Sequence, residues 1–170
     1  DKQLRDFVGE YKPAYPLLDL DNPVTYGPLD FYDYYFEHKR QQVDAMDKVT
    51  KVILEVGEEF GRKFGRHYGL FETYKLEDAE AAVVVLSSTA GTARAAVDRL
   101  RAAGLKVGLL KPRVFRPFPA QELVEALSHV QAIGVMDRSI VFGGMQNAGP
   151  LYLELCAAMQ VYGGSKRVPM

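Results

Sequence analysis

The sequence predicts an α/β protein in which a parallel sheet lies between two layers of helices, preceded by an extended arm and a long helix. Short apolar runs occur at 81–86, 107–110 and 132–136. The first of them is continuous and rich in β-branched residues, as buried parallel strands are. Segments with apolar residues at helical spacing separate the runs. Strands and helices therefore alternate, which is the pattern of a parallel sheet with right-handed crossovers.

The first 30 residues are expected to form the extended arm. Prolines at positions 13, 16, 23 and 28 disfavour a helix in this segment. The same segment carries more aromatic and leucine residues than a free linker would. We therefore expect it to lie on a protein surface, either of this domain or of a neighbour.

A long helix is predicted from Asp30, a suitable N-cap, to about Phe60. Apolar residues at three- and four-residue steps give it one apolar stripe. Its first turns carry the aromatic residues Tyr32, Tyr35 and Phe36, which cannot all face one core because neighbouring residues on a helix lie about 100° apart. These three are candidate interface residues, and packing inside this domain is the equal alternative. Glycines at 57, 61, 65 and 69 are expected to loosen the following stretch.

The remaining helices are predicted from capping signals and spacing. A turn at 87–92 precedes a helix that Gly104 closes. A second helix follows a proline-rich loop, and Pro150 opens a third, which ends at Gly163 and Gly164. Another strand is expected to begin near Val168, so the sheet is expected to be incomplete at its C-terminal end. The domain division that follows is an arm and linker helix at 1–78 and an α/β domain at 79–170.

Composition excludes several classes of function. The net charge of -1 gives no general electrostatic basis for binding nucleic acid or an anionic membrane, and no apolar run approaches the roughly 20 residues that cross a bilayer. The polar residues at 1–6 predict no secretory leader segment. Cys156 is the only cysteine, so no disulfide can form within the chain and a reducing cytoplasm is the expected location. One thiolate cannot hold an iron–sulfur cluster, and the three histidines show no metal-ligand spacing.

The loop at the end of the first core strand is a candidate anion site. It combines hydroxyls, a glycine and the start of a helix, whose free backbone N–H groups attract negative charge. The candidate residues are Ser87, Ser88, Thr89, Gly91 and Thr92. The alternative, which we favour, is that the hydroxyls cap the helix.

The two other strand-end loops carry charged and aromatic residues. Arginines in the rigid proline-rich loop could bind a phosphate or carboxylate, but we favour a contact with a neighbouring domain in which the phenylalanines are buried anchors. The third loop offers an Asp–Arg pair, for which a structural ion pair or turn is the more common outcome than catalysis. The candidate interface residues in these loops are Arg113, Phe115, Arg116, Phe118, Asp137 and Arg138.

No catalytic constellation is visible in the sequence. It contains no G-x-S-x-G nucleophile motif, no H-E-x-x-H and no clustered Cys and His. It also has no G-D-G segment with a downstream Asn, which is the usual signature of a thiamine diphosphate–Mg²⁺ site. We therefore predict neither a catalytic residue nor a metal ligand.

Several segments resemble the transketolase-C-terminal-like domain of the 2-oxoacid:ferredoxin oxidoreductase family, and most closely the pyruvate enzyme. The similar segments are SSTAGT at 87–92, GLKVGLLKPRVFRPFP at 104–119 and VMDR at 135–138. Upstream, DYYFEHKRQQ at 33–42 and FGRKFGRHYGL at 60–70 are similar to the segment that leads into that domain. The match spans nearly the whole chain, and the Arg-Pro-Phe-Pro loop together with the Phe-Gly-Arg segment is its most specific part.

The resemblance implies an anaerobic, cytoplasmic enzyme that cleaves a 2-oxoacid with thiamine diphosphate and Mg²⁺. It passes the acyl group to coenzyme A, releases CO2, and sends electrons through iron–sulfur clusters to ferredoxin. Other domains would hold these cofactors, and ferredoxin would bind through other subunits. This chain would be a scaffold domain, inactive by itself, within a homo-oligomer. No family catalytic residue carries over onto a numbered position. The alternatives are a stand-alone anion- or nucleotide-binding module and a pure assembly domain.

Overall fold

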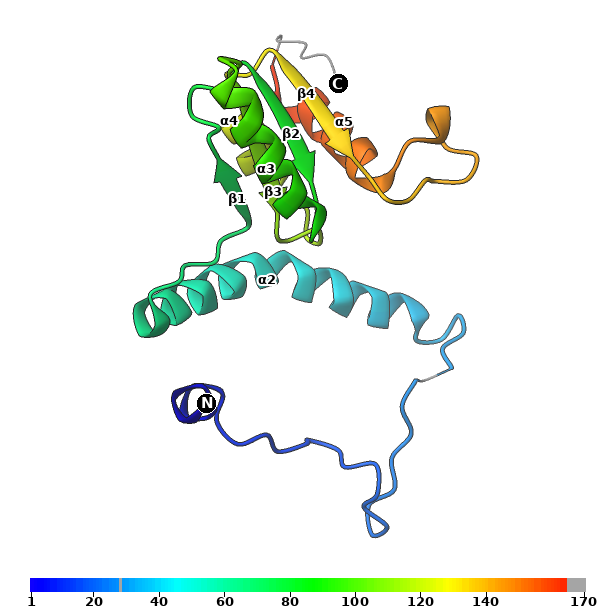
Figure 1. Ribbon diagram of the computed structural model, residues 1–170. Coiled ribbons are helices and arrows are strands. Elements are labelled where there is room, and N and C mark those ends of the chain that lie inside the picture. Colours follow the sequence, from blue (N-terminus) through cyan, green and yellow to red (C-terminus); the bar gives the residue numbers. More distant parts are fainter. Residues whose placement is uncertain (28, 165–170) are drawn as a thin grey trace. The chain divides into compact units, whose positions relative to one another are not determined.

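The computed structural model describes residues 1–27 and 29–164, and the chain divides into two units, residues 1–42 and 43–170 (Figure 1). The elements of the described residues are α1 (Lys2–Val8), α2 (Tyr35–Phe64), β1 (Phe71–Tyr74), β2 (Ala81–Val85), α3 (Thr89–Ala102), β3 (Val107–Pro112), α4 (Ala120–Leu127), β4 (Ala132–Met136), a 3-10 turn η1 (Met145–Asn147) and α5 (Pro150–Tyr162). The strand expected near Val168 falls outside the described residues.

The first unit differs from the predicted extended arm at its N-terminal end. Residues Lys2–Val8 form the short helix α1, which buries none of its side chains. The long helix begins at Tyr35 and not at Asp30. The Asp30 carboxylate pairs with the His38 imidazole instead. The chain between Asp30 and Tyr35 turns, and the Asp33 carboxylate accepts the Tyr34 N–H at 3.1 Å.

Helix α2 continues through two glycines that were expected to loosen it. Gly57 and Gly61 are buried. A Cβ at Gly57 would lie 2.1 Å from the Tyr68 carbonyl oxygen, and one at Gly61 would lie 2.2 Å from the His67 ring. These glycines let the chain that leaves α2 return tightly against the helix. The positive φ of 70° at Gly65 allows the sharp turn between the end of α2 and the returning chain.

The second unit is built around a four-stranded sheet in the order β1-β3-β2-β4. β2 pairs in parallel with both β3 and β4, which confirms the three predicted parallel strands. β1 was not predicted. It pairs antiparallel with β3, placing Glu72 opposite Lys111 and Tyr74 opposite Leu109. It therefore closes the edge of β3 that the sequence pattern would leave open.

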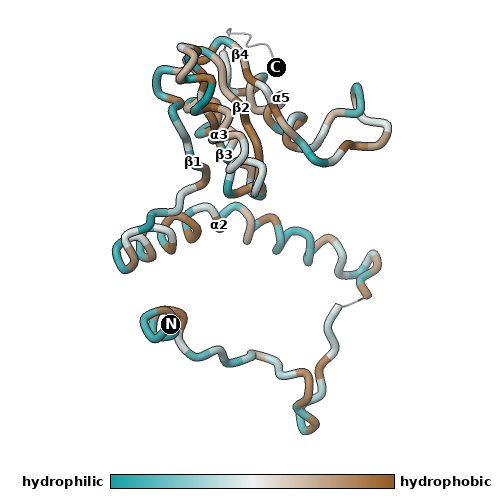
Figure 2. The backbone as a smooth tube through the Cα atoms, viewed as in Figure 1, coloured by the Kyte–Doolittle hydropathy of each residue, from teal (hydrophilic) through white to brown (hydrophobic). Residues whose placement is uncertain are grey.

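Helices cover both faces of the sheet, as the fold class requires (Figure 1). On one face, α4 and α5 pack over the main core, in which Val84 and Leu110 of the strands meet Leu123, Leu127 and Leu155. On the other face α3 packs alone through a smaller core. Figure 2 shows apolar residues concentrated on the central strands, while along α2 apolar and polar residues alternate.

Candidate functional site

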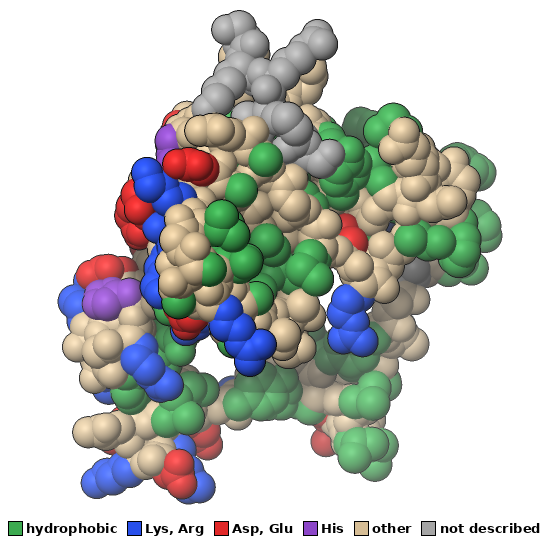
Figure 3. Space-filling model, turned by 45° about the horizontal axis from the view of Figure 1, so that its top comes forward, with side chains coloured by type: hydrophobic (Ala, Val, Ile, Leu, Met, Phe, Trp, Pro, Cys, Tyr) green, Lys and Arg blue, Asp and Glu red, His purple; other side chains and the backbone are tan. Residues whose placement is uncertain are grey.

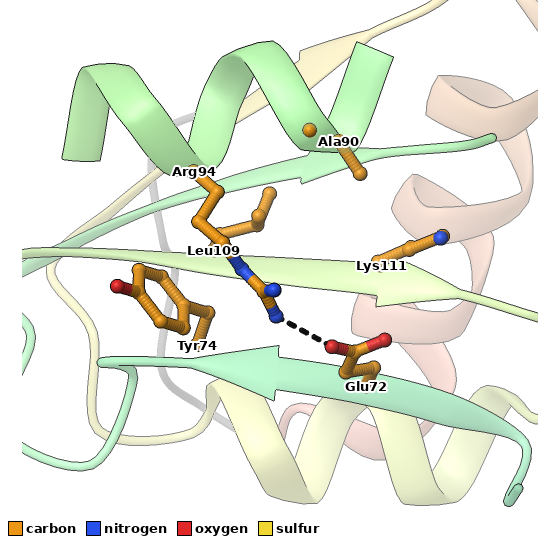
Figure 4. A pocket seen from close by; sticks show the side chains of 7 residues that line it. Glu72, Tyr74, Ala90, Arg94, Leu109 and Lys111 are labelled. Atoms are coloured by element: carbon orange, nitrogen blue, oxygen red, sulfur yellow. Dashed lines mark hydrogen bonds and ion pairs between the residues drawn. The ribbon is translucent and has the colours of Figure 1, made fainter. Parts of the chain in front are cut away.

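A cavity of about 110 Å³ lies beside α3 on the face of the sheet that this helix covers. Its residues come from β1, β3 and α3, and Figure 4 shows their side chains converging from the three elements. The lining residues are Glu72, Tyr74, Ala90, Gly91, Arg94, Leu109 and Lys111. The cavity is the most polar of the hollows in the described part of the second unit that are discussed below.

The strand register accounts for this convergence. Alternate residues of a strand point to the same face, so Glu72 and Tyr74 of β1 project beside Leu109 and Lys111, their partners on β3. Helical spacing then places Arg94 one turn after Ala90 on the side of α3 that faces these strands.

Glu72 is the centre of an ion-pair network. Its two carboxylate oxygens accept hydrogen bonds from Arg94 at 2.6 Å and from Arg113 at 2.7 Å. Partial burial acts to raise the pKa of Glu72, but the charge of Arg113 and the hydrogen bond from Arg94 outweigh it and lower the pKa. Each arginine also lies over an aromatic ring, Arg94 over Tyr74 at 4.4 Å and Arg113 over Tyr68 at 4.6 Å.

A second network holds α3 against β1 and the loop after it. The Asp98 carboxylate accepts hydrogen bonds from the Lys75 ammonium at 2.6 Å and the Tyr74 hydroxyl at 2.8 Å, and these bonds lower the pKa of Asp98. Near the end of α3, Arg101 binds both oxygens of Asp78, at 2.9 and 2.7 Å. It also donates to the Lys75 and Val107 carbonyls, so it ties three segments together.

The predicted anion residues lie at the start of α3, and Gly91 alone among them lines the cavity. Ser87 has a positive φ of 59°, and Ser87 and Ser88 are exposed. Ser88 occupies the N-cap position without a side-chain capping hydrogen bond, so the favoured capping interpretation is wrong for this residue. Thr89 and Thr92 fall within the first turn of the helix. Anion binding by the hydroxyls stays a prediction.

The proline-rich loop contacts its own domain. Arg116 donates to the Glu154 carboxylate at 2.5 Å and to the Phe115 carbonyl at 2.9 Å. Phe115 and Phe118 meet edge to face with their centroids 6.0 Å apart, and both pack against the main core. Internal packing therefore accounts for much of this loop, and a further contact with a neighbour stays a prediction.

Asp137 caps a helix that begins far along the chain. Its carboxylate accepts the backbone N–H of Leu151 at 2.8 Å and of Tyr152 at 3.2 Å, both in the first turn of α5. A Cβ at Gly149 would lie 2.2 Å from the same carboxylate, so only glycine leaves room for it. Asp137 therefore has a structural role as a helix cap and not as an ion-pair partner of Arg138. The Arg138 side chain is exposed.

An apolar groove of about 450 Å³ opens on the other side of α3, above β2 and β4 (Figure 3). Ala132, Gly134 and Met136 of β4 face it and are exposed, because α3 does not extend over this strand. A second apolar hollow, of about 500 Å³, lies along α2 between Val52 and Phe60 and is also lined by Tyr68 and Val114. The run at 132–136 was predicted as a strand, and this strand is exposed on its α3 side.

The aromatic residues at the start of the long helix are exposed within the first unit. Tyr32 is 100% exposed, Phe36 75% and Tyr35 55%. Their exposure is compatible with the predicted interface, which stays a prediction.

The side chains described here do not fit an iron–sulfur cluster or a metal. Such a cluster takes four thiolates, whereas the chain has one cysteine, Cys156, which is half-buried beside Tyr152. Among the described residues, no three His, Cys, Asp or Glu side chains lie close enough together to hold a metal ion. In residues 1–27 and 29–164, no helix combines the length and apolarity needed to cross a bilayer.

The mostly parallel sheet, with helices on both faces and one long preceding helix, defines an α/β domain. Comparison with known proteins then assigns this domain to a family. The family model described as pyruvate:ferredoxin oxidoreductase core domain II matches residues 79–169. The chain belongs to this family.

Two relatives with similar sequences agree with this assignment. The chain is 50% identical to the pyruvate synthase subunit PorA of Thermotoga maritima, over 94% of this chain and 40% of that protein. It is 41% identical to the ketoisovalerate oxidoreductase subunit VorA of Pyrococcus horikoshii, over 91% and 39%. A solved 2-oxoglutarate:ferredoxin oxidoreductase from Magnetococcus marinus matches 87% of this chain and 21% of that chain, with 20% identity and a TM-score of 0.47. The chain spans about 40% of the length of the two relatives.

Proposed function

We propose that this chain is an assembly domain of a pyruvate:ferredoxin oxidoreductase. The whole enzyme would cleave pyruvate, transfer the acetyl group to coenzyme A, release CO2 and reduce ferredoxin. The proposal for the reaction rests on the family match at 79–169 and on the name of the PorA relative. The higher identity to the pyruvate synthase subunit, 50% against 41% for the ketoisovalerate subunit, favours pyruvate as the 2-oxoacid.

The observation that supports an assembly role is the apolar groove beside α3. A sheet face lined by Ala132, Gly134 and Met136 is unfavourable in water. The cost is about 25 cal/mol for each Å² of apolar surface that stays exposed. Small side chains on β4 and at Ala93 and Ala96 on α3 let another element approach closely. A groove of this kind is typical of a contact between domains or subunits, and the named relatives are themselves subunits.

Four carboxylates of the described second unit that could do chemistry are occupied by internal contacts. Glu72, Asp78 and Asp98 hold arginine and lysine side chains, and Asp137 caps α5. We therefore infer that thiamine diphosphate, Mg²⁺, the iron–sulfur clusters and coenzyme A are held by other domains or subunits. Ferredoxin would bind there too.

Assembly can be tested by co-expressing the chain with the other subunits of the complex. The double variant Ala96→Lys, Met136→Lys places two charges in the groove at exposed positions, so the domain itself should fold. We expect the other subunits to lose co-purification and pyruvate-dependent viologen reduction to fall with them. The matched control is Ala95→Lys, Met145→Lys, which adds the same charges at exposed positions outside the groove. Normal assembly and activity of the groove variant would contradict the proposal.

The chain without its partners provides a second test. We expect it to show no pyruvate decarboxylation with thiamine diphosphate, Mg²⁺, coenzyme A and a viologen acceptor. Turnover above a blank would show that this chain carries its own reaction centre.

A further inference from the structure

We propose that the cavity between β1, β3 and α3 binds a phosphate group through Lys111 and Arg94. The starting observation is a cross-strand pair that does not form. Glu72 and Lys111 are direct partners in the β1–β3 register, and opposite charges in such positions normally attract each other. Here both oxygens of Glu72 bind arginines instead.

This arrangement leaves the Lys111 ammonium available. Within the described residues, no ion pair or hydrogen bond involves it, although the side chain is half-buried and lines the cavity. The carboxylate of its cross-strand partner is already neutralised, because Glu72 pairs with both Arg94 and Arg113. An anion from outside would therefore supply the missing partner.

Arg94 can bind the same anion. Its hydrogen bond to Glu72 uses Nη2 alone, and stacking on the Tyr74 ring occupies the face of the guanidinium and not its N–H edge. Figure 4 shows Arg94 reaching from α3 across β3 to Glu72, while Lys111 projects from β3 further along the same cavity, with its ammonium directed away from this pair. Two cations from different elements thus border one cavity, which is the arrangement that binds phosphate oxygens.

The size and charge of the cavity select the ligand. A volume of about 110 Å³ accommodates a group as small as one phosphate. Counting the charged lining residues, Arg94 and Lys111 against Glu72 leave an excess of positive charge, and Arg113 adds to it from outside. Ala90 and Gly91 form the wall without bulky side chains. This site is separate from the exposed hydroxyls of Ser87 and Ser88.

The test is titration of the full chain with inorganic phosphate, followed by ¹H–¹⁵N NMR and by thermal unfolding. Sodium chloride at equal ionic strength is the reference for general screening. We expect saturable shifts at residues 72–74, 90–94 and 109–111 and a phosphate-specific rise in Tm. Lys111→Met should weaken phosphate binding roughly tenfold, because it removes one charge-assisted hydrogen bond. Lys111→Arg should restore it.

Two further variants keep the outcome decisive. Lys106→Met removes a lysine just before β3 that pairs with Glu80 outside the cavity, and it should leave phosphate affinity unchanged. Glu72→Gln removes the competing negative charge, so it should tighten phosphate binding. The same variant should lower the stability of the fold. A network with a purely structural role would not produce these two opposite effects. AMP as a competitor distinguishes a phosphate ester from free phosphate as the source. Equal phosphate binding in wild type and Lys111→Met, or no specific binding at all, overturns the proposal.

Discussion

The carboxylate of Asp137, which directly follows β4, accepts the backbone N–H of Leu151 in the first turn of α5 at 2.8 Å. The two residues are 14 positions apart, and the loop 138–149 lies between them. The bond fixes where α5 begins relative to the sheet, because the first N–H groups of a helix have no partner within it. It also places negative charge at the positive end of the helix.

We therefore expect Asp137→Ala to lower the free energy of unfolding by about 1 kcal/mol, the usual cost of losing such a cap. Asp137→Asn keeps an acceptor oxygen and should lose much less. Arg138→Ala is the neighbouring control and should stay within about 0.5 kcal/mol of wild type. Urea denaturation followed by circular dichroism measures all three. A loss in Arg138→Ala as large as that in Asp137→Ala would show that the loop and not the cap is responsible.

The helical glycines offer a matched pair of substitutions. Gly57→Ala would drive a methyl group to 2.1 Å from the Tyr68 carbonyl oxygen, and backbone must move to relieve it. We expect a loss of about 1–3 kcal/mol, the range for overpacking. Gly91→Ala, in the first turn of α3, meets nothing within 4 Å and should be neutral or stabilising by up to about 1 kcal/mol. Thermal unfolding distinguishes the two, and a harmless Gly57→Ala would contradict the tight return of the chain.

Part of the fold could be predicted from the sequence and part could not, for identifiable reasons. The parallel strands were predictable because they form unbroken apolar runs. β1 was missed because Glu72 and Thr73 interrupt its pattern and only four residues take part. Helix α1 buries nothing and has no side-chain cap, so it has no apolar stripe to reveal it.

The candidate site shows the same limit. Arg113 and Asp137 were singled out as charged residues at strand ends, which was informative. Their partners are Glu72, 41 positions away, and the start of α5, 14 positions away, and no local spacing encodes such pairs. Lys111 was passed over because nothing in a single sequence shows that its cross-strand partner, Glu72, is taken by arginines.

The carboxylates that bind α3 to β1 predict a dependence of stability on pH. Hydrogen bonds from Lys75 and then Tyr74 lower the pKa of Asp98, and the hydrogen bond from Arg101 lowers that of Asp78. A group whose pKa is lower in the folded state contributes stability above its unfolded pKa, and that stability is lost as the pH falls through the folded value. We therefore expect the contribution of these two carboxylates to the free energy of unfolding to be constant above about pH 5 and to fall below about pH 4.

The measurement is a series of urea titrations between neutral and acid pH. Asp98→Asn should be less stable than wild type at neutral pH, and the gap should narrow as the solution becomes acidic, since wild-type Asp98 is then protonated as well. Glu10→Gln, in the first unit, is the control: Glu10 is exposed and its closest ion-pair contact, with Lys12, is 3.8 Å long. A gap between Asp98→Asn and wild type that stays constant at every pH would contradict the assignment.

The last prediction concerns the aromatic residues of the first unit. Tyr35 and Phe36 are exposed although each would contribute favourable free energy on burial. An apolar cluster that stays in water favours association, so we expect wild-type protein to self-associate with rising concentration in light scattering. The double variant Tyr35→Ser, Phe36→Ser should remain monomeric and keep its far-UV circular dichroism. Tyr162→Ser removes another aromatic residue, 51% exposed in the second unit, and should associate like wild type. A strictly monomeric wild type together with an unfolded double variant would mean that the two aromatic residues are core and that the interface prediction is wrong.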